Sequence, residues 1–298
     1  MKKAIASAIV LSIAVFSIAG LAIFLFFESP LSLLENNWKI APIAIVAAAF
    51  ANATAVGGGF LFVPLFIFGY GLTATAALKL SLATQAFGMS SGALGWSRHY
   101  ILKHKFISAC AASFVGMYLG TYWWNIDNVH IKLIFGWVNI AIGIAILLEM
   151  KLGAKTHRAH INDDTLLKKF FYLLVCVAGG LINSWASIGI GEVVALYLMF
   201  VYRMRIDYAI ATGVAVLAFD SIVGLAFHSY SGGIRWDYLV FTAPGVIIGG
   251  RYGAKLGRWA EAKVIHSERA ARISPLKWIF TGIVVIDGII MLFQVYTS

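Results

Sequence analysis

A glycine-rich apolar segment occurs twice in this chain, and this repeat limits the folds that the chain can adopt. The segment 57–64 (GGGFLFVP) returns as 189–196 (GIGEVVAL), 132 residues later (57 to 189). The same displacement aligns Tyr70 with Tyr202, Ala77 with Ala209, Phe87 with Phe219 and Gly92 with Gly224, and a displacement one residue longer aligns Gly116 and Gly120 with Gly249 and Gly253. The repeat predicts a fold of two equivalent halves.

The composition places both halves in a membrane. Of the 298 residues, 61% are hydrophobic and 12% are charged, whereas a soluble domain carries about 25% charged residues. We expect one all-α integral membrane domain over 1–298, because no linker or low-complexity tract divides it. The net charge of +10 comes from basic residues in short loops between apolar stretches. This pattern is typical of membrane topology control, so we expect no nucleic-acid partner.

Two apolar stretches do not have the length of a single membrane crossing. A spanning helix needs about 20 apolar residues. Such spans are predicted near 4–27, 74–97, 106–124, 131–150, 206–227, 237–257 and 276–295, the first as an uncleaved N-terminal anchor. The stretches 40–69 and 170–200 are too short for two crossings and long for one, and the repeated glycines interrupt each near its middle. Glycine-broken segments at corresponding places in two halves are typical of a transporter's binding site.

Two topologies follow from these stretches. If each stretch crosses the bilayer once, the halves are parallel; if each enters and returns as a broken hairpin, the halves are inverted. The hairpin topology places the basic loops near 98–105, 151–169, 203–205 and 255–277 on the same side as Lys2 and Lys3. The positive-inside rule favours it. We therefore predict an extra N-terminal helix (4–27) and inverted repeats over 39–150 and 168–295, each a re-entrant hairpin followed by three spanning helices. The N-terminus is then cytoplasmic and the C-terminus periplasmic or extracellular.

Several of these segments resemble the sulfite exporter TauE/SafE family of membrane transporters. The resemblance is carried by 57–65 (GGGFLFVPL), by Ala77 and Ser81 with 91–94 (SGAL), by 209–212 (AIAT), by 223–228 (VGLAFH), and by 243–245 (APG) with Gly249 and Gly253. It implies export of sulfite, sulfonates or related small organic anions across a bacterial inner membrane. Three residues, Lys79, Ile190 and Glu192, depart from the family pattern, so the substrate can differ from that of better-known members.

The two glycine breaks are the predicted substrate site. Helix N-termini present unpaired N–H groups that suit an anion, and glycine lets the backbone approach a ligand closely. The candidate substrate-binding residues are Asn52, Thr54, Gly57, Gly58, Gly59, Lys79, Ser81, Gln85, Asn183, Ser184, Ser187, Gly189 and Gly191. The alternative is that the glycines only allow close helix packing.

Charged residues inside apolar segments are the remaining candidates. Lys79 either binds the substrate anion, in which case Lys79→Ala abolishes binding, or extends from the first turn of its helix to the membrane interface. Glu192 and Asp220 are predicted to carry protons during transport, the alternative being structural pairing. We expect a structural role for Asp287 and a packing role for His228.

The sequence favours a secondary active transporter over other classes. It contains no P-loop and no grouping of Cys and His residues typical of an enzyme or metal site, so we expect no catalytic residue, metal or cofactor. Cys110 and Cys176 are expected in helix packing. We predict export of small sulfur-containing anions by alternating access, coupled to protons or to the membrane potential. The alternatives are uptake of carboxylates or other small anions, and an anion channel; a homodimer is compatible with a bundle of this size.

Overall fold

The computed structural model describes residues 2–54, 57–96, 100–124, 126–152, 161, 164–265 and 275–297. In these ranges the regular secondary structure is helical, as predicted. The elements are α1 (Lys2–Phe26), α2 (Pro30–Asn37), α3 (Ile40–Thr54), α4 (Gly59–Pro64), the π-helical η1 (Leu65–Gly69), α5 (Ala74–Gly95), α6 (Lys103–Tyr118), the π-helical η2 (Leu119–Trp123), α7 (Asn128–Leu152), α8 (Leu166–Ala186), α9 (Ile190–Phe200), α10 (Ile206–Ser231), α11 (Trp236–Ile265) and α13 (Pro275–Thr297). Helices occupy every predicted span.

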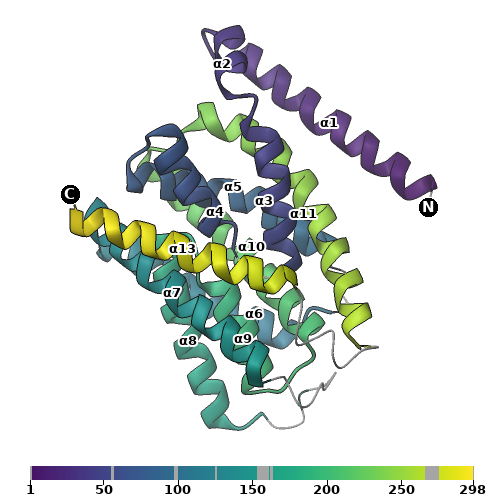
Figure 1. The fold of residues 1–298 in the computed structure, drawn as a ribbon, viewed down its shortest axis with the longest axis vertical. Coiled ribbons are helices and arrows are strands. Elements are labelled where there is room, and N and C mark those ends of the chain that lie inside the picture. Colours follow the sequence, from purple (N-terminus) through teal and green to yellow (C-terminus); the bar gives the residue numbers. More distant parts are fainter. Residues whose placement is uncertain are drawn as a thin grey trace.

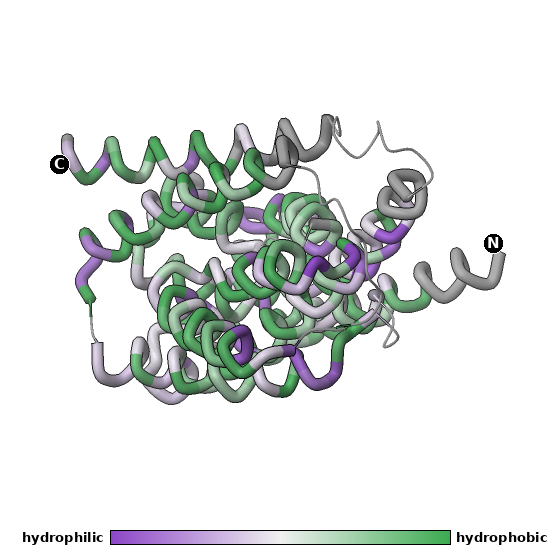
Figure 2. The backbone as a smooth tube through the Cα atoms, turned by 90° about the horizontal axis from the view of Figure 1, so that it is seen from below, coloured by the Kyte–Doolittle hydropathy of each residue, from purple (hydrophilic) through white to green (hydrophobic). Residues whose placement is uncertain are grey.

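Apolar helices form most of the molecule. Within the described residues, three stretches are long and apolar enough to cross a bilayer: Asn128–Leu148, Leu166–Ala186 and Ile206–Ser231. Shorter apolar helices include Ile40–Ala53, Gly59–Gly69 and Ile190–Phe200. Figure 2 shows hydrophobic residues along most of the helices. Large apolar side chains such as Phe26 and Phe170 are exposed, as expected for a surface that faces lipid.

Several helices of one half pack against helices of the other half. α5 and α10 pack against each other, α7 packs against α13, α3 lies along α11, and α8 lies along α6 (Figure 1). In the repeat, α3, α4, α5, α6 and α7 correspond to α8, α9, α10, α11 and α13. Under this correspondence the α3–α11 pair becomes the α8–α6 pair, and the α5–α10 and α7–α13 pairs become themselves. The first helix of each half therefore packs on a helix of the other half, so neither half forms its core alone.

The repeated glycines of the continuous α6–η2 segment and of α11 explain these crossed pairings. A Cβ at Gly116 would meet the Val177 carbonyl of α8, and a Cβ at Gly249 would meet the Ile45 carbonyl of α3. Val177 and Ile45 are themselves 132 residues apart (45 to 177). The second pair repeats the pattern, since Gly120 faces Ser184 and Leu181 while Gly253 faces Ala49. Small residues at matched positions thus let the backbones approach, as is common between membrane helices.

Each broken stretch is a hairpin whose two ends lie together. In the first, Tyr70 follows η1 and packs in the same cluster as Ile40, the first residue of α3. In the second, the Tyr197 hydroxyl of α9 donates to the Lys168 carbonyl in the first turn of α8, at 2.8 Å. The chain therefore turns back at 57–58 and at 187–189, the two positions that the glycine repeat predicts.

The two hairpins open toward opposite ends of α5. The open end of hairpin 1 (α3, α4 and η1) lies at the start of α11, where the rings of Tyr70 and Tyr238 are 5.3 Å apart, and the chain passes from it directly into α5. The open end of hairpin 2 (α8 and α9) lies at the start of α6, the helix after α5, because the Tyr172 hydroxyl donates to the Lys105 carbonyl at 3.1 Å.

Basic loops meet at the open end of hairpin 2. The Lys105 ammonium donates to Asp164 at 2.8 Å and to the Tyr202 hydroxyl at 2.7 Å, and it lies 4.1 Å from the centre of the Tyr202 ring. Partial burial raises the pKa of Asp164, but hydrogen bonds from Lys105 and Tyr202 outweigh it, so that pKa lies below its ordinary value. The cluster of Lys105, Asp164 and Tyr202, named the clasp below, joins α6, the segment before α8 and the end of α9.

Candidate functional site

The tips of the two hairpins touch each other. A Cβ at Gly59, the first residue of α4, would lie 2.8 Å from the Ser187 carbonyl carbon and would overlap its oxygen. Only glycine fits such a backbone-to-backbone contact. In the second tip, Ser187 ends α8 in the left-handed conformation and Gly189 has a φ of 115°, a value that favours glycine. The glycines therefore bring the starts of α4 and α9 together.

One carboxylate spans both tips. Glu192 stands in the first turn of α9, and its Oε1 accepts a hydrogen bond from the Gly57 N–H at 2.6 Å. Its Oε2 accepts from the Gly189 N–H at 3.1 Å. The side chain is only 3% exposed. Backbone N–H groups at a helix N-terminus favour negative charge, and here donors from both tips converge on one acidic side chain of the chain itself.

Polar side chains of α5 complete the site. The Gln85 amide donates to the Ser187 carbonyl at 2.8 Å, and the Ser187 hydroxyl donates to the Ser81 hydroxyl at 2.9 Å. Ser81 and Gln85 are one turn apart on a buried face of α5. Hairpin 2 is thereby tied to α5 at its tip. Ser81, Gln85, Ser187, Glu192 and the tip glycines form the group that we call the tip site.

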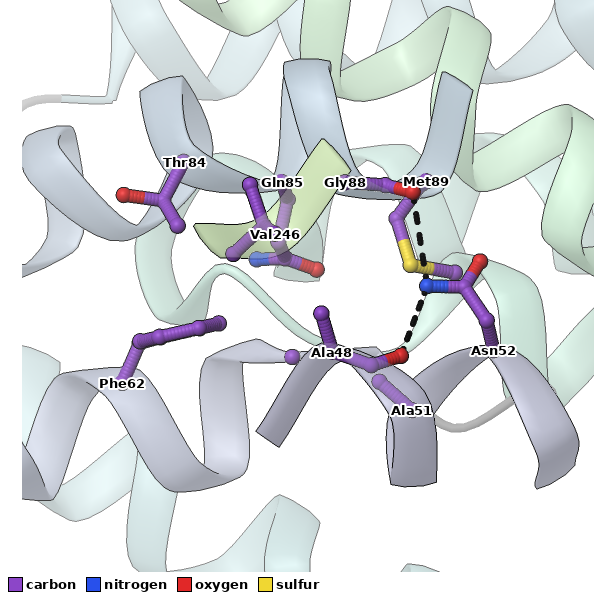
Figure 3. A pocket seen from close by; sticks show the side chains of 10 residues that line it. Ala48, Ala51, Asn52, Phe62, Thr84, Gln85, Gly88, Met89 and Val246 are labelled. Atoms are coloured by element: carbon purple, nitrogen blue, oxygen red, sulfur yellow. Dashed lines mark hydrogen bonds between the residues drawn. The ribbon is translucent and has the colours of Figure 1, made fainter. Parts of the chain in front are cut away.

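The tip site adjoins a cavity of about 10 Å³. Gln85 reaches from α5 toward the α3–α4 segment beside this cavity, and Asn52 lies at its other side (Figure 3). Gln85 Oε1 and Asn52 Oδ1 are buried and have no hydrogen-bond partner among the described residues. One water needs about 10–15 Å³ and at least two polar partners. The cavity therefore suits a single water, and the tips are closed around it.

Three predicted substrate-binding residues bond to helix backbone or to a neighbouring helix, and their role in binding stays a prediction. The Asn52 amide donates to the Ala48 carbonyl at 2.9 Å and to the Gly88 carbonyl of α5 at 3.4 Å (Figure 3). The Asn183 amide donates to Asp220 of α10 at 2.7 Å. Ser184 donates to the Leu181 carbonyl at 2.7 Å, within its own helix.

Other predicted residues border these groups. The Gly191 carbonyl lies against α10 at Gly213, where a Cβ would be 2.5 Å from it, and Gly58 lines the cavity. Asp220 is fully buried, and its second oxygen has no partner among the described residues. Its proton-carrying role stays a prediction. The Thr54 side chain lies outside the described residues.

Lys79 lies apart from the tip site. Its ammonium donates to the Gly232 carbonyl, just after α10, at 2.9 Å. Lys79 is two residues from Ser81, and successive helix residues are rotated by about 100°, so the two side chains leave α5 in nearly opposite directions. The structure therefore brings Ser81 and Gln85 to the tips but not Lys79.

The remaining intramembrane candidates also lie elsewhere. His228 is buried near the end of α10, and its ring nitrogens have no hydrogen-bond partner among the described residues. Asp287 lies on α13. A further charged residue, Arg251 of α11, was not among these candidates; it lines a separate groove of about 420 Å³ between α1, α5, α10 and α11, together with apolar side chains, Ser90 and Ser91. Within the described ranges no three His, Cys, Asp or Glu residues gather as metal ligands.

Two features, one in the tip site and one at the open end of hairpin 2, were not predicted from the sequence. The sequence predicted proton carriage or structural pairing for Glu192 without naming its partners, although a glutamate three residues after the N-cap has the spacing to accept from the N-cap N–H. That spacing could have predicted the hydrogen bond from the Gly189 N–H to one Glu192 oxygen. It could not have predicted the bond from the Gly57 N–H to the other oxygen. The clasp was not predicted either, because Lys105, Asp164 and Tyr202 are far apart in sequence and each is ordinary in its loop.

Sequence comparison finds one family model and two curated relatives that match most of the chain. A sequence model of the family described as "Sulfite exporter TauE/SafE" matches residues 40–291. The chain is 22% identical over 246 residues to the probable membrane transporter protein YunE of Bacillus subtilis (strain 168), covering 75% of this chain and 89% of that protein. It is 23% identical over 265 residues to the probable membrane transporter protein YjnA of the same organism, covering 83% of this chain and 96% of that protein. No solved structure matches the chain.

Proposed function

Because the chain belongs to the sulfite exporter TauE/SafE family of membrane transporters, we propose that it exports small sulfur-containing anions, such as sulfite, sulfoacetate or other sulfonates, by alternating access. One observation carries the proposal: N–H groups from both hairpin tips converge on a buried carboxylate, at 2.6 and 3.1 Å from its oxygens. A site in which donors from two hairpins converge on one carboxyl group has the chemistry to hold a substrate oxyanion.

The arrangement of the hairpins supports an inverted-repeat mechanism. The hairpins open toward opposite ends of α5, and their tips meet between those ends. In a bilayer this corresponds to two re-entrant hairpins that enter from opposite faces. Access to a central site then alternates as one hairpin or the other withdraws. The clasp places parts of three basic loops at one end, which we assign to the cytoplasm, with the N-terminus on the same side and the C-terminus on the other.

The donors of the tip site favour small anions with several oxygens. They comprise the Gly57 and Gly189 N–H groups, the Ser81 and Ser187 hydroxyls and the Gln85 amide. Sulfite and sulfonate groups present three oxygens and can accept from several of these donors together. A carboxylate presents two, as Glu192 does, so carboxylate uptake is the runner-up. The water-sized cavity at the closed tips favours a transporter with an occluded state over an open anion channel.

Thermal stabilisation of the detergent-purified protein tests the proposal. The probes are sulfite, methanesulfonate, sulfoacetate and acetate, and a ligand of the folded state adds about 2.7 kcal/mol of stability at one hundred times its Kd. We expect stabilisation by the sulfur oxyanions in the wild type, and weaker stabilisation in Ser187→Ala. The matched control is Ser108→Ala, whose hydroxyl donates to the Lys105 carbonyl on α6. Stabilisation by acetate alone would transfer the assignment to carboxylates, and no stabilisation by any probe would overturn it.

Counterflow in proteoliposomes distinguishes a transporter from a channel. A transporter takes up radiolabelled sulfite against an excess of unlabelled sulfite inside, because loaded sites exchange faster than empty sites return. A channel dissipates the label without a transient overshoot. An overshoot is expected, and its absence at a sulfite concentration that stabilises the protein would favour the channel alternative.

A further inference from the structure

We infer that Glu192 is a tethered anion that occupies the substrate position between the tips, and that an incoming anion replaces it only when the carboxylate takes up one proton. This inference rests on the anion transport proposed above and names how the same site is regulated. It follows from what the two oxygens bind, from the charges around them and from the space that the closed tips leave.

The carboxylate uses the donors that a substrate would need. Its two oxygens accept from Gly57 of one tip and Gly189 of the other, so it fastens the hairpins together in the way expected of a bound oxyanion. The adjoining cavity of about 10 Å³ leaves no room for a second anion beside it. An anion can reach these N–H groups only after the Glu192 oxygens have left them.

The groups that face the carboxylate cannot balance a second negative charge. Besides its own helix, it faces the Gly57 and Gly189 N–H groups, and the Gln85 amide and the Leu217 side chain lie beside Gly57. The charged neighbours on packed helices point elsewhere: Asp220 of α10 accepts from Asn183, and Lys79 of α5 donates to Gly232.

The remaining titratable groups of the packed helices lie away from the tip along their helices. Lys168, Lys169 and Tyr172 belong to the first two turns of α8, with Cys176 one turn further, and Asp207 and Tyr208 belong to the first turn of α10. His228 and Tyr230 lie in its last turns. Tyr70 follows hairpin 1 at its open end. Two anions would therefore repel at the tips within a low-dielectric interior.

A proton removes this conflict. On binding, Glu192 forms one O–H bond with a proton from the aqueous phase to which the site is open. The carboxylic acid is then neutral, and one of its oxygens carries an O–H donor. That donor faces a backbone N–H donor, so the hydrogen bond at this oxygen is lost. The Gly57 and Gly189 N–H groups exchange the Glu192 oxygens for oxygens of the substrate. No other bond forms or breaks, and one proton enters the site with each monoanion.

Binding of methanesulfonate across pH tests this exchange, because this anion stays ionised throughout the range. In the wild type, uptake of one proton makes the Kd rise about tenfold per pH unit above the pH at which the empty site titrates. In weakly buffered solution, proton uptake approaches one per bound anion. Glu192→Gln is expected to bind with a Kd that does not change with pH and without proton uptake. Asp287→Asn, a matched acid-to-amide change on α13, is expected to keep the wild-type slope.

The outcomes separate this inference from the transport proposal. A pH-independent Kd in the wild type, or an unchanged slope in Glu192→Gln, overturns the tethered anion while anion binding stands. If neither methanesulfonate nor sulfite binds the wild type or Glu192→Gln at any pH, both ideas fail. Should Glu192→Gln not fold, proton uptake by the wild type still decides, because binding without uptake overturns the exchange.

Discussion

Lys79 and Glu192 are both charged residues in apolar segments, and the structure gives them different surroundings. Lys79 bonds to the Gly232 carbonyl at 2.9 Å, whereas Glu192 bonds to both tips. We therefore expect Lys79→Ala to change the affinity for methanesulfonate less than threefold, in contrast to the loss of binding expected from the sequence. Titration of both proteins at one pH measures this. A loss of more than tenfold, with unchanged thermal stability, would return Lys79 to the substrate site.

Gly59 tests the contact between the tips. An added Cβ would lie 2.8 Å from the Ser187 carbonyl carbon and 2.6 Å from an Ile188 methyl carbon. Overpacking of this kind costs about 1–3 kcal/mol, so Gly59→Ala is expected to lower the thermal midpoint. Gly20→Ala on α1 is the matched control, because nothing lies within 4 Å of its added Cβ. Equal thermal midpoints for Gly59→Ala and Gly20→Ala would mean that the close contact between the tips does not contribute to stability.

At the residue scale, the sequence indicates which polar residues interrupt apolar segments but not which groups they contact. The predicted set of tip glycines, Ser81, Gln85 and Ser187 converges in the structure. The same set included Asn52 and Asn183, which bond to neighbouring helices. A sequence shows that a residue is polar in an apolar segment, but the direction of its side chain depends on helix rotation. That rotation is fixed by packing against other helices.

At the scale of elements, the clasp should contribute stability that depends on pH. The lowered pKa of Asp164 means that its contribution is fully present above the unfolded pKa, about 3.9, and is lost as pH falls through the lower folded pKa. Asp164→Asn is expected to be less stable at pH 7 by up to about 1 kcal/mol, and the difference is expected to shrink as pH falls below about 3.9. Unfolding measured across this pH range tests it, with Glu35→Gln, an exposed acid of α2, as the control. A difference that does not change with pH would contradict an ionic origin.

The elements themselves were largely predictable because length and glycine position have direct physical meaning in a bilayer. The two stretches that failed the 20-residue rule are each broken into separate helices, and the breaks fall at the repeated glycines. Their re-entrant course in a bilayer stays a prediction. The short α2 and the π-helical turns η1 and η2 were not predicted, since a change of hydrogen-bond register leaves no period in apolar residues. The crossed pairing of α3 with α11 and α8 with α6 had a signal, the matched glycines of α6 and α11, whose partners only the structure identifies.

At the scale of the whole molecule, cysteine labelling distinguishes inverted from parallel halves. In the inverted topology the loop before α7 lies outside and the start of α6 inside; parallel halves reverse both. We expect Asp127→Cys to react with an impermeant maleimide in intact cells and Lys103→Cys to react only after permeabilisation. Cys110 and Cys176 are buried and can be replaced by alanine as the background. Arg235→Cys lies outside in both topologies and is the positive control. Labelling of Lys103→Cys alone in intact cells would establish parallel halves.

Charge counting across the transport cycle leads to the last prediction. With Glu192 as the tethered anion, the empty site carries one negative charge as carboxylate, and the loaded site carries one as substrate beside a neutral acid. Both forms move the same charge, so transport of a monoanion with one proton is electroneutral. Its direction then follows the combined anion and proton gradients, and a membrane potential has no effect on it. In Glu192→Gln the empty site is neutral and the loaded site is negative, so flux becomes sensitive to potential.

Proteoliposomes with a potassium diffusion potential measure this difference. Wild-type methanesulfonate flux is expected to respond to a pH gradient and not to valinomycin, while Glu192→Gln shows the reverse. Each 100 mV acts on a moving elementary charge with about 2.3 kcal/mol, so the effect on the variant is large enough to observe. A wild type driven by potential would mean that the anion crosses without its proton, and Glu192 would then hold the tips closed without coupling them to pH.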